Sequence, residues 1–326
     1  MLEHGGQLRK AAERYGIPLE QWLDLSTGIN PHSYTPPQIP LDVWTHLPQE
    51  QDGLEQAVAA YYGTAELLPV SGSQAAIQAL PRLRARSRVG VLHPGYAEHA
   101  HAWRNAGHEV VAVDASDVRL NDLDVLVLMN PNNPTGVTFT HEQLHGWHAL
   151  LAQRGGWLIV DEAFIDATPQ ASIVMAQIPQ GIIVLRSLGK FFGLAGARVG
   201  FVAAHVSLLE PLRELFGPWN LTGPSRFVAQ AALRDVAWQA ATRTRLQQDC
   251  VRLMQLLRDA GFPPSGGCVL FQWIVSERAA DLHQRLAQRG ILTRLFDEPH
   301  SLRFGLPCSE TDWQRLHDAL EQECVR

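Results

Sequence analysis

The chain has 326 residues, 46% of them hydrophobic, so it is long enough to bury an extended core. Its formal net charge is −6 and its arginines are scattered singly, which argues against a nucleic-acid-binding surface. The four cysteines lack CxxC spacing and predict neither a zinc site nor a disulfide framework. With no signal-peptide pattern and no apolar stretch of membrane-spanning length, we expect a cytoplasmic protein that is not bound to a membrane.

Residues 1–45 predict an irregular N-terminal arm. Prolines, which interrupt helices and strands, are frequent in its second half. They are Pro31, Pro36, Pro37 and Pro40. We expect this arm to pack against the active site or against a smaller C-terminal domain.

Six short apolar runs predict strands, because each is too short for a buried helix. They are 88–94, 109–115, 124–131, 157–164, 182–187 and 198–204. Helix-length segments separate most of them, and the segment 140–154 opens with the capping-box pattern Thr140-His141-Glu142-Gln143. Crossover helices predict a mainly parallel sheet, whereas the short glycine-rich connection before the last run predicts one antiparallel strand.

The C-terminal third predicts a long helix followed by a small α+β domain. Residues 225–260 read as one continuous helix; strands are expected at 269–275, 291–296 and 301–306, and a helix at 281–289. The predicted fold is therefore α/β, with a large domain at 46–224 built on a mainly parallel mixed sheet flanked by helices. Residues 225–326 form the linker helix and the small domain.

Lysine is rare in this chain, which makes Lys190 informative. The chain has two lysines, Lys10 and Lys190, among its 27 basic residues other than histidine. An amine can lose its proton and attack a carbonyl, whereas a guanidinium stays protonated, so a Schiff base requires lysine. The glycines around Lys190, at 189, 193, 196 and 200, favour a functional loop over a chance surface lysine.

Three further patterns lie at the ends of predicted strands, where ligands bind in open parallel sheets. Ser71-Gly72-Ser73-Gln74 precedes an apolar helix and is typical of a phosphate-binding helix start, although it could be an ordinary cap. Asn130 to Gly136 follows another strand and could be a plain turn. Asp161 ends a buried apolar run, where a carboxylate is costly unless a cation balances it.

A protonated pyridine nitrogen would balance Asp161, and Ser187 with Arg198 would add a hydroxyl and a guanidinium to a phosphate. A metal is the rival partner for Asp161, but no histidine or cysteine stands at ligand spacing beside it. No metal site is predicted, and the stripe His141, His145 and His148 is expected to be solvated. A nucleotide site in which Lys190 contacts only phosphate is weaker, because no P-loop or GxGxxG pattern is present.

The order of Asn133, Asp161, Ser187-x-x-Lys190 and Arg198 resembles the fold-type I enzymes that use pyridoxal 5'-phosphate, over nearly the whole chain. The segments 161–166 and 186–190 are similar to histidinol-phosphate aminotransferases and to their relatives, the threonine-phosphate decarboxylases of cobalamin biosynthesis. The N-terminal arm, with His4-Gly5-Gly6 and the segment 24–31, resembles the decarboxylases more closely.

The resemblance implies a role for each matching residue. Lys190 would carry the cofactor, Asp161 would hold its pyridinium, Tyr96 would stack on its ring and Asn133 would contact its phenolic oxygen. The expected phosphate ligands are Gly72, Ser73, Gln74, Ser187 and Arg198. The expected substrate-binding residues are His4, Gly5, Gly6, Asn30, Arg294 and Arg303.

Two departures from the aminotransferase pattern matter. Phe164 replaces a tyrosine whose hydroxyl reaches the cofactor, which favours the decarboxylase. Leu47 replaces a tyrosine that reaches the phosphate across the dimer interface, which puts this contact in doubt although a homodimer is still implied.

The expected reaction is decarboxylation of L-threonine O-3-phosphate to 1-amino-2-propanol O-phosphate. One alternative with the same cofactor is a histidinol-phosphate-type aminotransferase. A second alternative, of another class, is a regulatory module that binds the cofactor without catalysis.

Overall fold

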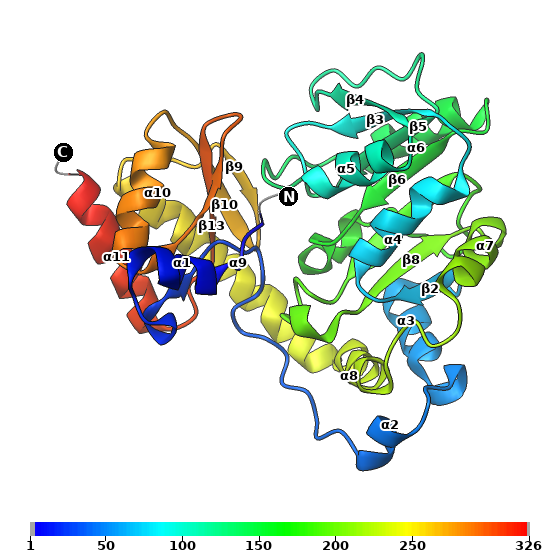
Figure 1. Ribbon diagram of the computed structural model, residues 1–326, viewed down its shortest axis with the longest axis horizontal. Coiled ribbons are helices and arrows are strands. Elements are labelled where there is room, and N and C mark those ends of the chain that lie inside the picture. Colours follow the sequence, from blue (N-terminus) through cyan, green and yellow to red (C-terminus); the bar gives the residue numbers. More distant parts are fainter. Residues whose placement is uncertain (1–3, 325–326) are drawn as a thin grey trace. The chain divides into compact units, whose positions relative to one another are not determined.

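The computed structural model describes residues 4–324, and its internal contacts divide them into two units (Figure 1). The large unit comprises Ser33–Asn132 and Thr138–Ala241. The small unit comprises the chain up to His32, residues 133–137, and the chain from Thr242 onward. The three-part division expected from the sequence, at 1–45, 46–224 and 225–326, remains a proposal.

A seven-stranded mixed sheet is the frame of the large unit, with the strand order β2-β8-β7-β6-β5-β3-β4. Neighbouring strands from β7 to β4 are parallel, whereas β8 is antiparallel to β7 and β2 is antiparallel to β8. The predicted α/β fold with one reversed strand is confirmed. The strands are β2 Leu67–Val70, β3 Arg88–Leu92, β4 Glu109–Val113, β5 Val125–Met129, β6 Trp157–Asp161, β7 Ile182–Ser187 and β8 Gly200–Ala204.

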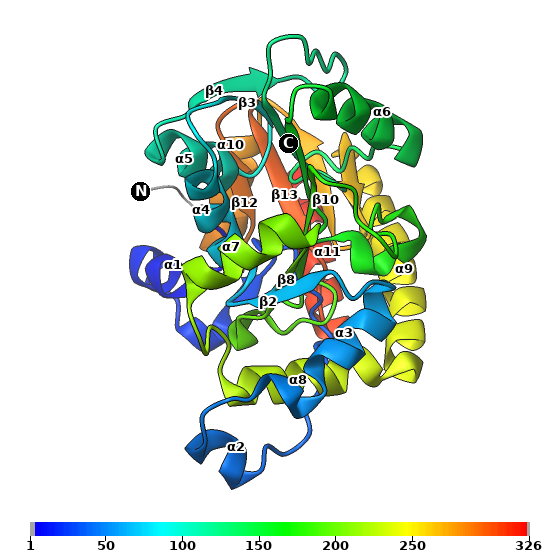
Figure 2. The same ribbon diagram turned by 90° about the vertical axis from the view of Figure 1, so that its right-hand side faces the viewer.

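The strand β2 was missing from the sequence prediction. It is short and contains Pro69, a residue that sheets tolerate at an edge because it lacks an N–H to donate. β2 does lie at an edge and pairs only with β8 among the described strands (Figure 2).

Helices cover the sheet of the large unit on both faces. One apolar cluster lies between the sheet and α4, α5 and α7 (Figure 1), and its largest member is Trp103, which is 1% exposed. The predicted capping box at Thr140 is confirmed: its hydroxyl accepts from the Gln143 N–H, and Gln143 bonds back to Thr140. The helices are α2 Leu41–Thr45, α3 Leu54–Tyr62, α4 Ser73–Ala79, α5 Ala97–Asn105, α6 His141–Ala152, α7 Val206–Phe216 and α8 Gly223–Arg234.

The small unit is an α+β structure with two sheets. One is a parallel pair of β1 and β11; the other is antiparallel, in the order β12-β13-β10-β9. The strands are β1 Leu23–Asp24, β9 Gly266–Cys268, β10 Phe271–Val275, β11 Ile291–Leu292, β12 Arg294–Phe296 and β13 Ser301–Gly305. The helices are α1 Leu8–Tyr15, α10 Ala279–Gln288 and α11 Glu310–Cys324, while α9, Val236–Asp259, begins in the large unit and ends in the small one.

Three local predictions need correction. The N-terminal arm is not wholly irregular, because residues 8–15 form α1, an amphipathic helix that buries Ala11. The helix expected at 225–260 is interrupted at Asp235, whose carboxylate accepts the Trp238 N–H and so starts α9 as a separate helix. The strand expected at 291–296 is two strands, β11 and β12, which pair in different sheets.

No helix among the described residues is long and apolar enough to span a lipid bilayer.

Candidate active site

Asp161 ends β6 in the interior of the large unit and is 2% exposed. One carboxylate oxygen accepts the Ala163 N–H at 3.0 Å, and the other lies 3.0 Å from Nε2 of His99, which is itself buried. Burial of a carboxylate is costly unless donors or cations surround it. The Asp161 side chain is therefore held in place by contacts from α5 and from the turn after β6.

Lys190 lies in the turn that follows β7, the strand next to β6. It is half-buried, and its Nζ lies 5.3 Å from the centroid of the Phe164 ring. Phe164 is 2% exposed and follows Asp161 by three residues. The parallel pairing of β6 and β7 thus brings the amine and the carboxylate to the same edge of the sheet, as predicted from their strand positions.

The predicted phosphate ligands converge at the start of α4. Gly72 has φ of +76° and an added Cβ would overlap the guanidinium of Arg198, so only glycine lets the two approach. Gly200 pairs with Ser187 across β7 and β8, and a Cβ there would lie 2.5 Å from the Ser73 backbone nitrogen. These glycines bring Ser73, Ser187 and Arg198 close together at the start of α4.

The side chain of Gln74 contacts two neighbouring residues. Its Nε2 donates to Glu98 at 2.7 Å, and its Oε1 accepts from the Tyr96 hydroxyl at 3.3 Å. Tyr96 is the N-cap residue of α5, and its ring meets the His99 ring edge-on with centroids 6.0 Å apart. The side chain of Gln74 therefore orients Tyr96, and a role toward phosphate is left to its backbone.

Asn133 and Arg303 contact one another within the small unit. Arg303 is 6% exposed; its Nη1 donates to Oδ1 of Asn133 at 2.5 Å and its Nη2 donates to the Ser26 carbonyl at 2.7 Å. A buried guanidinium needs acceptors for its donors. Arg303 is thus rigidly held, and its orientation is coupled to that of Asn133.

The other predicted substrate residues divide into two groups. His4, Gly5 and Arg294 line a cavity of 490 Å³ in the small unit. A Cβ on Gly5 would run into the Ser26 backbone, and the Gly6 N–H donates to Oγ of Ser26 at 2.7 Å, so the glycines fix the arm beside this cavity. Asn30 and Arg303 are not among the described residues that line it.

Asn30 is buried and shapes the arm. It is 2% exposed, and its Oδ1 accepts the His32 N–H at 2.9 Å, an Asx-type bond that turns the chain.

Comparison with known proteins identifies the family of this chain. The sequence matches the family described as aminotransferase class I and II over residues 45–320. The chain belongs to the aminotransferase class I and II family.

Two relatives span nearly the whole chain. The chain is 58% identical to the threonine-phosphate decarboxylase of Pseudomonas aeruginosa, over 98% of this chain and 97% of that protein. It is 40% identical to the threonine-phosphate decarboxylase of a Sinorhizobium species, over 97% of each.

Among solved structures, the histidinol-phosphate aminotransferase of Sinorhizobium meliloti, in complex with pyridoxal-5'-phosphate, is similar with a TM-score of 0.83 and 19% identity. The similarity covers 100% of this chain and 98% of that one. At this identity it shows the fold alone, so the fold-type I expectation is confirmed.

Sequence analysis did not single out His99, which the structure places beside Asp161. The available signal was its position three residues after Tyr96, since residues at that spacing share one face of a helix. With Tyr96 at the start of α5, His99 was placed to reach the same region of the site.

A buried charge cluster beside the site was also missed. Arg186 is 2% exposed and donates to Glu162 at 2.6 Å, to Asp166, and to the Ser172 hydroxyl at 3.0 Å. Burial alone would lower the pKa of Arg186, but the carboxylates of Asp166 and Glu162 outweigh it and raise that pKa. The signal was a charged residue within an apolar strand, one position before Ser187.

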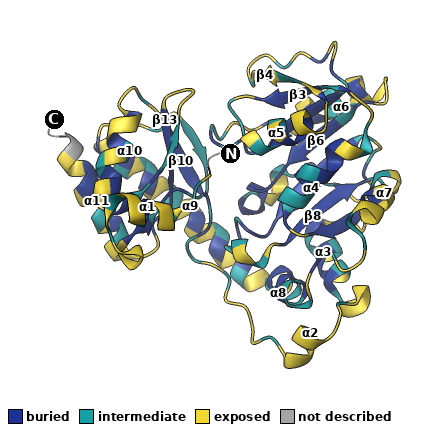
Figure 3. Ribbon diagram, viewed as in Figure 1, coloured by how far each residue is buried: buried dark blue, intermediate teal, exposed yellow. Residues whose placement is uncertain are grey.

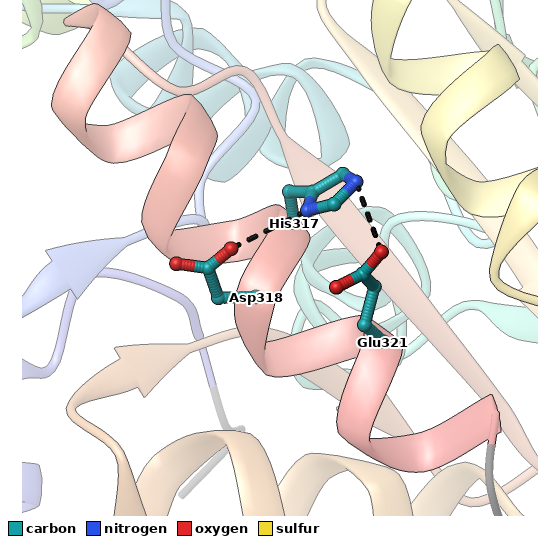
Figure 4. Close-up of side chains that lie close together, drawn as sticks. All are labelled: His317, Asp318 and Glu321. Carbon is teal, nitrogen blue, oxygen red and sulfur yellow. Dashed lines mark hydrogen bonds and ion pairs between the residues drawn. The ribbon is translucent and has the colours of Figure 1, made fainter.

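One surface cluster has a metal-like composition but no further support. His317, Asp318 and Glu321 lie on α11, where the imidazole approaches both carboxylates (Figure 4). All three are exposed, and within the described residues nothing else joins them, so they read as surface ion pairs of small energetic effect.

Proposed function

We propose that this chain catalyses the decarboxylation of L-threonine O-3-phosphate to 1-amino-2-propanol O-2-phosphate, in the R form, a step of cobalamin biosynthesis. The observation that carries the proposal is 58% identity to a threonine-phosphate decarboxylase over nearly the full length of both chains. The histidinol-phosphate aminotransferase noted above shares the fold at 19% identity, which says nothing about substrate.

Pyridoxal 5'-phosphate is the cofactor, and the large unit has the groups to hold it. Lys190 would supply the amine for covalent attachment, Asp161, positioned by His99, would be the partner of the pyridine nitrogen, and Tyr96 would supply a ring for stacking. The set formed by Gly72, Ser73, Ser187 and Arg198 would receive the phosphate, with the Gln74 backbone beside it. When bound, the cofactor supplies an electron sink for the bond that breaks at the substrate α-carbon.

The small unit would bind the two acidic groups of the substrate separately. Arg303, held by Asn133 and Ser26, would bind the carboxylate, because a fixed guanidinium can orient one planar anion. Arg294 and His4, which line the cavity, would bind the phosphate. Gly5, Gly6 and Asn30 would shape the arm that carries His4.

Orientation decides which bond breaks. In decarboxylation the bond between the α-carbon and the carboxylate breaks, carbon dioxide leaves, and a proton takes its place on that carbon. A carboxylate fixed by Arg303 favours one near-attack geometry. Phe164, which lies against Lys190 without a hydroxyl, is a further difference from the aminotransferase pattern.

We also propose that the enzyme is a cytoplasmic homodimer. Most of α2 is exposed, as its yellow colour in Figure 3 shows, and large apolar side chains are among the exposed residues of this helix and its flanks. Leu41 is 77% exposed, Trp44 62% and Leu47 64%. Apolar side chains gathered in this way are typical of a surface that a second protein covers. Sedimentation of the purified holoenzyme tests the dimer, and a monomer at micromolar concentration would contradict it.

One assay separates the candidate functions. The holoenzyme is supplied with L-threonine O-3-phosphate, with and without 2-oxoglutarate, and both carbon dioxide and glutamate are measured. Carbon dioxide release that needs no keto acid supports the proposal. Glutamate formation with retained carboxylate would instead support an aminotransferase, and cofactor binding without turnover of either kind would support the regulatory module.

Borohydride reduction tests the attachment site. Mass analysis of the reduced holoenzyme should find the pyridoxyl group on the peptide that contains Lys190. An unmodified Lys190 would contradict its role and favour a lysine that merely contacts phosphate.

A further inference from the structure

The cavity in the small unit has basic lining residues that the proposed mechanism does not use. Besides His4 and Arg294, it is lined by Lys10 and Arg14 of α1 and by His283 of α10. Lys10 is one of the two lysines of the chain, so an ammonium group is found here although arginine is used almost everywhere else. With a volume of 490 Å³ the cavity has the size of a small-molecule site.

The helix α1 presents two like charges to this cavity. Lys10 and Arg14 are four residues apart and therefore share one face of the helix, an arrangement that destabilises a helix unless an anion compensates it. Ala11, on the same helix, is 6% exposed and packs with Trp22 and Ala287. This packing fixes α1 on the small unit, so Lys10 and Arg14 line the cavity with exposed side chains.

The charge of the lining is strongly positive. Lys10, Arg14 and Arg294 are three permanent cations, whereas Asp297 is the one carboxylate among the described lining residues. His283 also lines the cavity, and its Nδ1 lies 2.8 Å from Oγ1 of Thr293. Such a set matches a dianion with several acceptor oxygens better than it matches a single carboxylate.

We propose that Lys10 and Arg14 are specificity-determining residues that bind the phosphate group of the substrate in this cavity, together with Arg294. The proposal rests on the proposed function, since it assigns the cavity to the phosphomonoester of that substrate. Lys10 contributes a compact charge with three rotatable donors, and Arg14 contributes a planar fork. The carboxylate is assigned elsewhere, because Arg303 does not line the cavity.

The test compares Lys10→Gln and Arg14→Gln with the wild-type holoenzyme. Each change should raise KM for L-threonine O-3-phosphate about fivefold and leave kcat within about twofold, because the interaction contributes equally to ground-state and transition-state binding. Lys10→Arg keeps the positive charge, so its KM should lie close to that of the wild type. Arg9→Gln is the matched control: Arg9 is the exposed neighbour of Lys10 on α1, is not part of the cavity lining, and should leave KM unchanged.

Inorganic phosphate serves as the probe that does not depend on turnover. Its Kd for the holoenzyme, measured by calorimetry, should rise in both glutamine variants by about the same factor as KM, and it should inhibit competitively with the substrate. This binding can be measured even if no carbon dioxide is released, so failure of the proposed function is distinguishable from failure of the phosphate site.

Three outcomes would overturn the inference. Unchanged KM and unchanged phosphate Kd in both variants would show that α1 does not bind the anion. If Arg9→Gln raised KM and the phosphate Kd equally, the effect would come from the loss of one positive charge and not from contacts in the cavity. Phosphate binding that depends on Lys10 and Arg14 but does not compete with substrate would assign the cavity to a separate phosphorylated ligand and contradict the substrate assignment.

Discussion

The imidazole of His99 lies 3.0 Å from a carboxylate oxygen of Asp161, and both side chains are buried in the large unit. The other oxygen of Asp161 has the Ala163 N–H as its donor. Two donors from two elements, α5 and the turn after β6, thus fix one carboxylate. His99 is a positioning residue in this arrangement, because it acts through Asp161.

Replacing His99 should weaken cofactor binding. In His99→Leu the buried Asp161 loses a donor, at a cost of about 2 kcal/mol, which corresponds to roughly 30-fold in the Kd of the cofactor. His99→Gln keeps an N–H donor near the position of Nε2 and should lose less cofactor affinity. Cofactor titration of the apoenzyme, followed by absorbance, measures both, and equal affinity in His99→Leu and wild type would contradict the positioning role.

Phe164→Tyr should change the acid–base behaviour of the bound cofactor. Phe164 lies against Lys190, with 5.3 Å between the amine and the ring centroid, so a new hydroxyl would enter the surroundings of the attachment point. A neighbouring donor changes the proton affinity of the group it contacts. We expect the pH dependence of the holoenzyme spectrum to shift and carbon dioxide release to fall several-fold. Phe164→Leu controls for lost packing, and a tyrosine variant with the leucine variant's pH profile would rule out the hydroxyl effect.

The strands of the large sheet were predictable because they are buried on both faces. In the run from Val125 to Met129 every residue is buried, and such a run stands out in the sequence. Edge and surface elements lack this signal. β2 contains a proline and α1 is a short helix with one buried residue, so tertiary contacts rather than local pattern determine both.

The candidate site was predictable where its chemistry is rare in the sequence. Lysine is rare among the basic residues, and one lysine lies in a glycine-rich loop after an apolar strand, so Lys190 stands out in the sequence. Asp161 stands out because it is a carboxylate at the end of an apolar strand. His99 was not predictable in the same way, because its role depends on a contact between α5 and β6 that are distant in sequence. The use of Gln74 to hold Tyr96 likewise appears only when two helices are packed.

An inhibition experiment should distinguish the roles of the two proposed substrate-binding residues, Arg303 and Arg294. The proposed product, 1-amino-2-propanol O-phosphate, retains the phosphate but lacks the carboxylate. Arg303→Gln should therefore lower kcat/KM for the substrate by about 10- to 100-fold, the usual worth of a charge-assisted hydrogen bond, and leave the inhibition constant of the product unchanged. Arg294→Gln should raise that inhibition constant about tenfold. The opposite pattern would exchange the two assignments.

The cysteines should react with thiol reagents in a fixed order. Burial raises the pKa of Cys268 to about 12, so its thiol stays protonated at neutral pH, and the thiolate is the reactive form. Cys308 is exposed and should be labelled before Cys268 and Cys250, which are both half-buried. Mass analysis after timed labelling of the native enzyme measures the order. Rapid labelling of Cys268 without denaturant would contradict the raised pKa of its thiol.

The ion pair of Asp52 and Arg226 should make stability depend on pH. Burial tends to raise the pKa of Asp52, but hydrogen bonds from Arg226 and the Leu54 N–H outweigh it and lower that pKa. A lowered folded pKa means that the stabilisation is present above the ordinary carboxyl pKa of about 3.9 and is lost as the pH falls through the folded value. Arg226 is 6% exposed, so loss of its partner should lower the free energy of unfolding more than loss of a partner in a surface ion pair.

Asp52→Asn should therefore lower the free energy of unfolding by about 1 kcal/mol at pH 7, with a smaller difference at pH 3. Glu55, the second carboxylate on Arg226, limits the loss because it still pairs with the guanidinium. Urea unfolding of both proteins at pH 7, 5 and 3 measures the difference. Asp117→Asn is the control, since Asp117 pairs with Arg119 on the exposed surface. Loss of this ion pair should leave the free energy of unfolding unchanged at all three pH values. A difference for Asp52→Asn that stays constant from pH 7 to pH 3 would show that the ionised carboxylate is not what stabilises the pair.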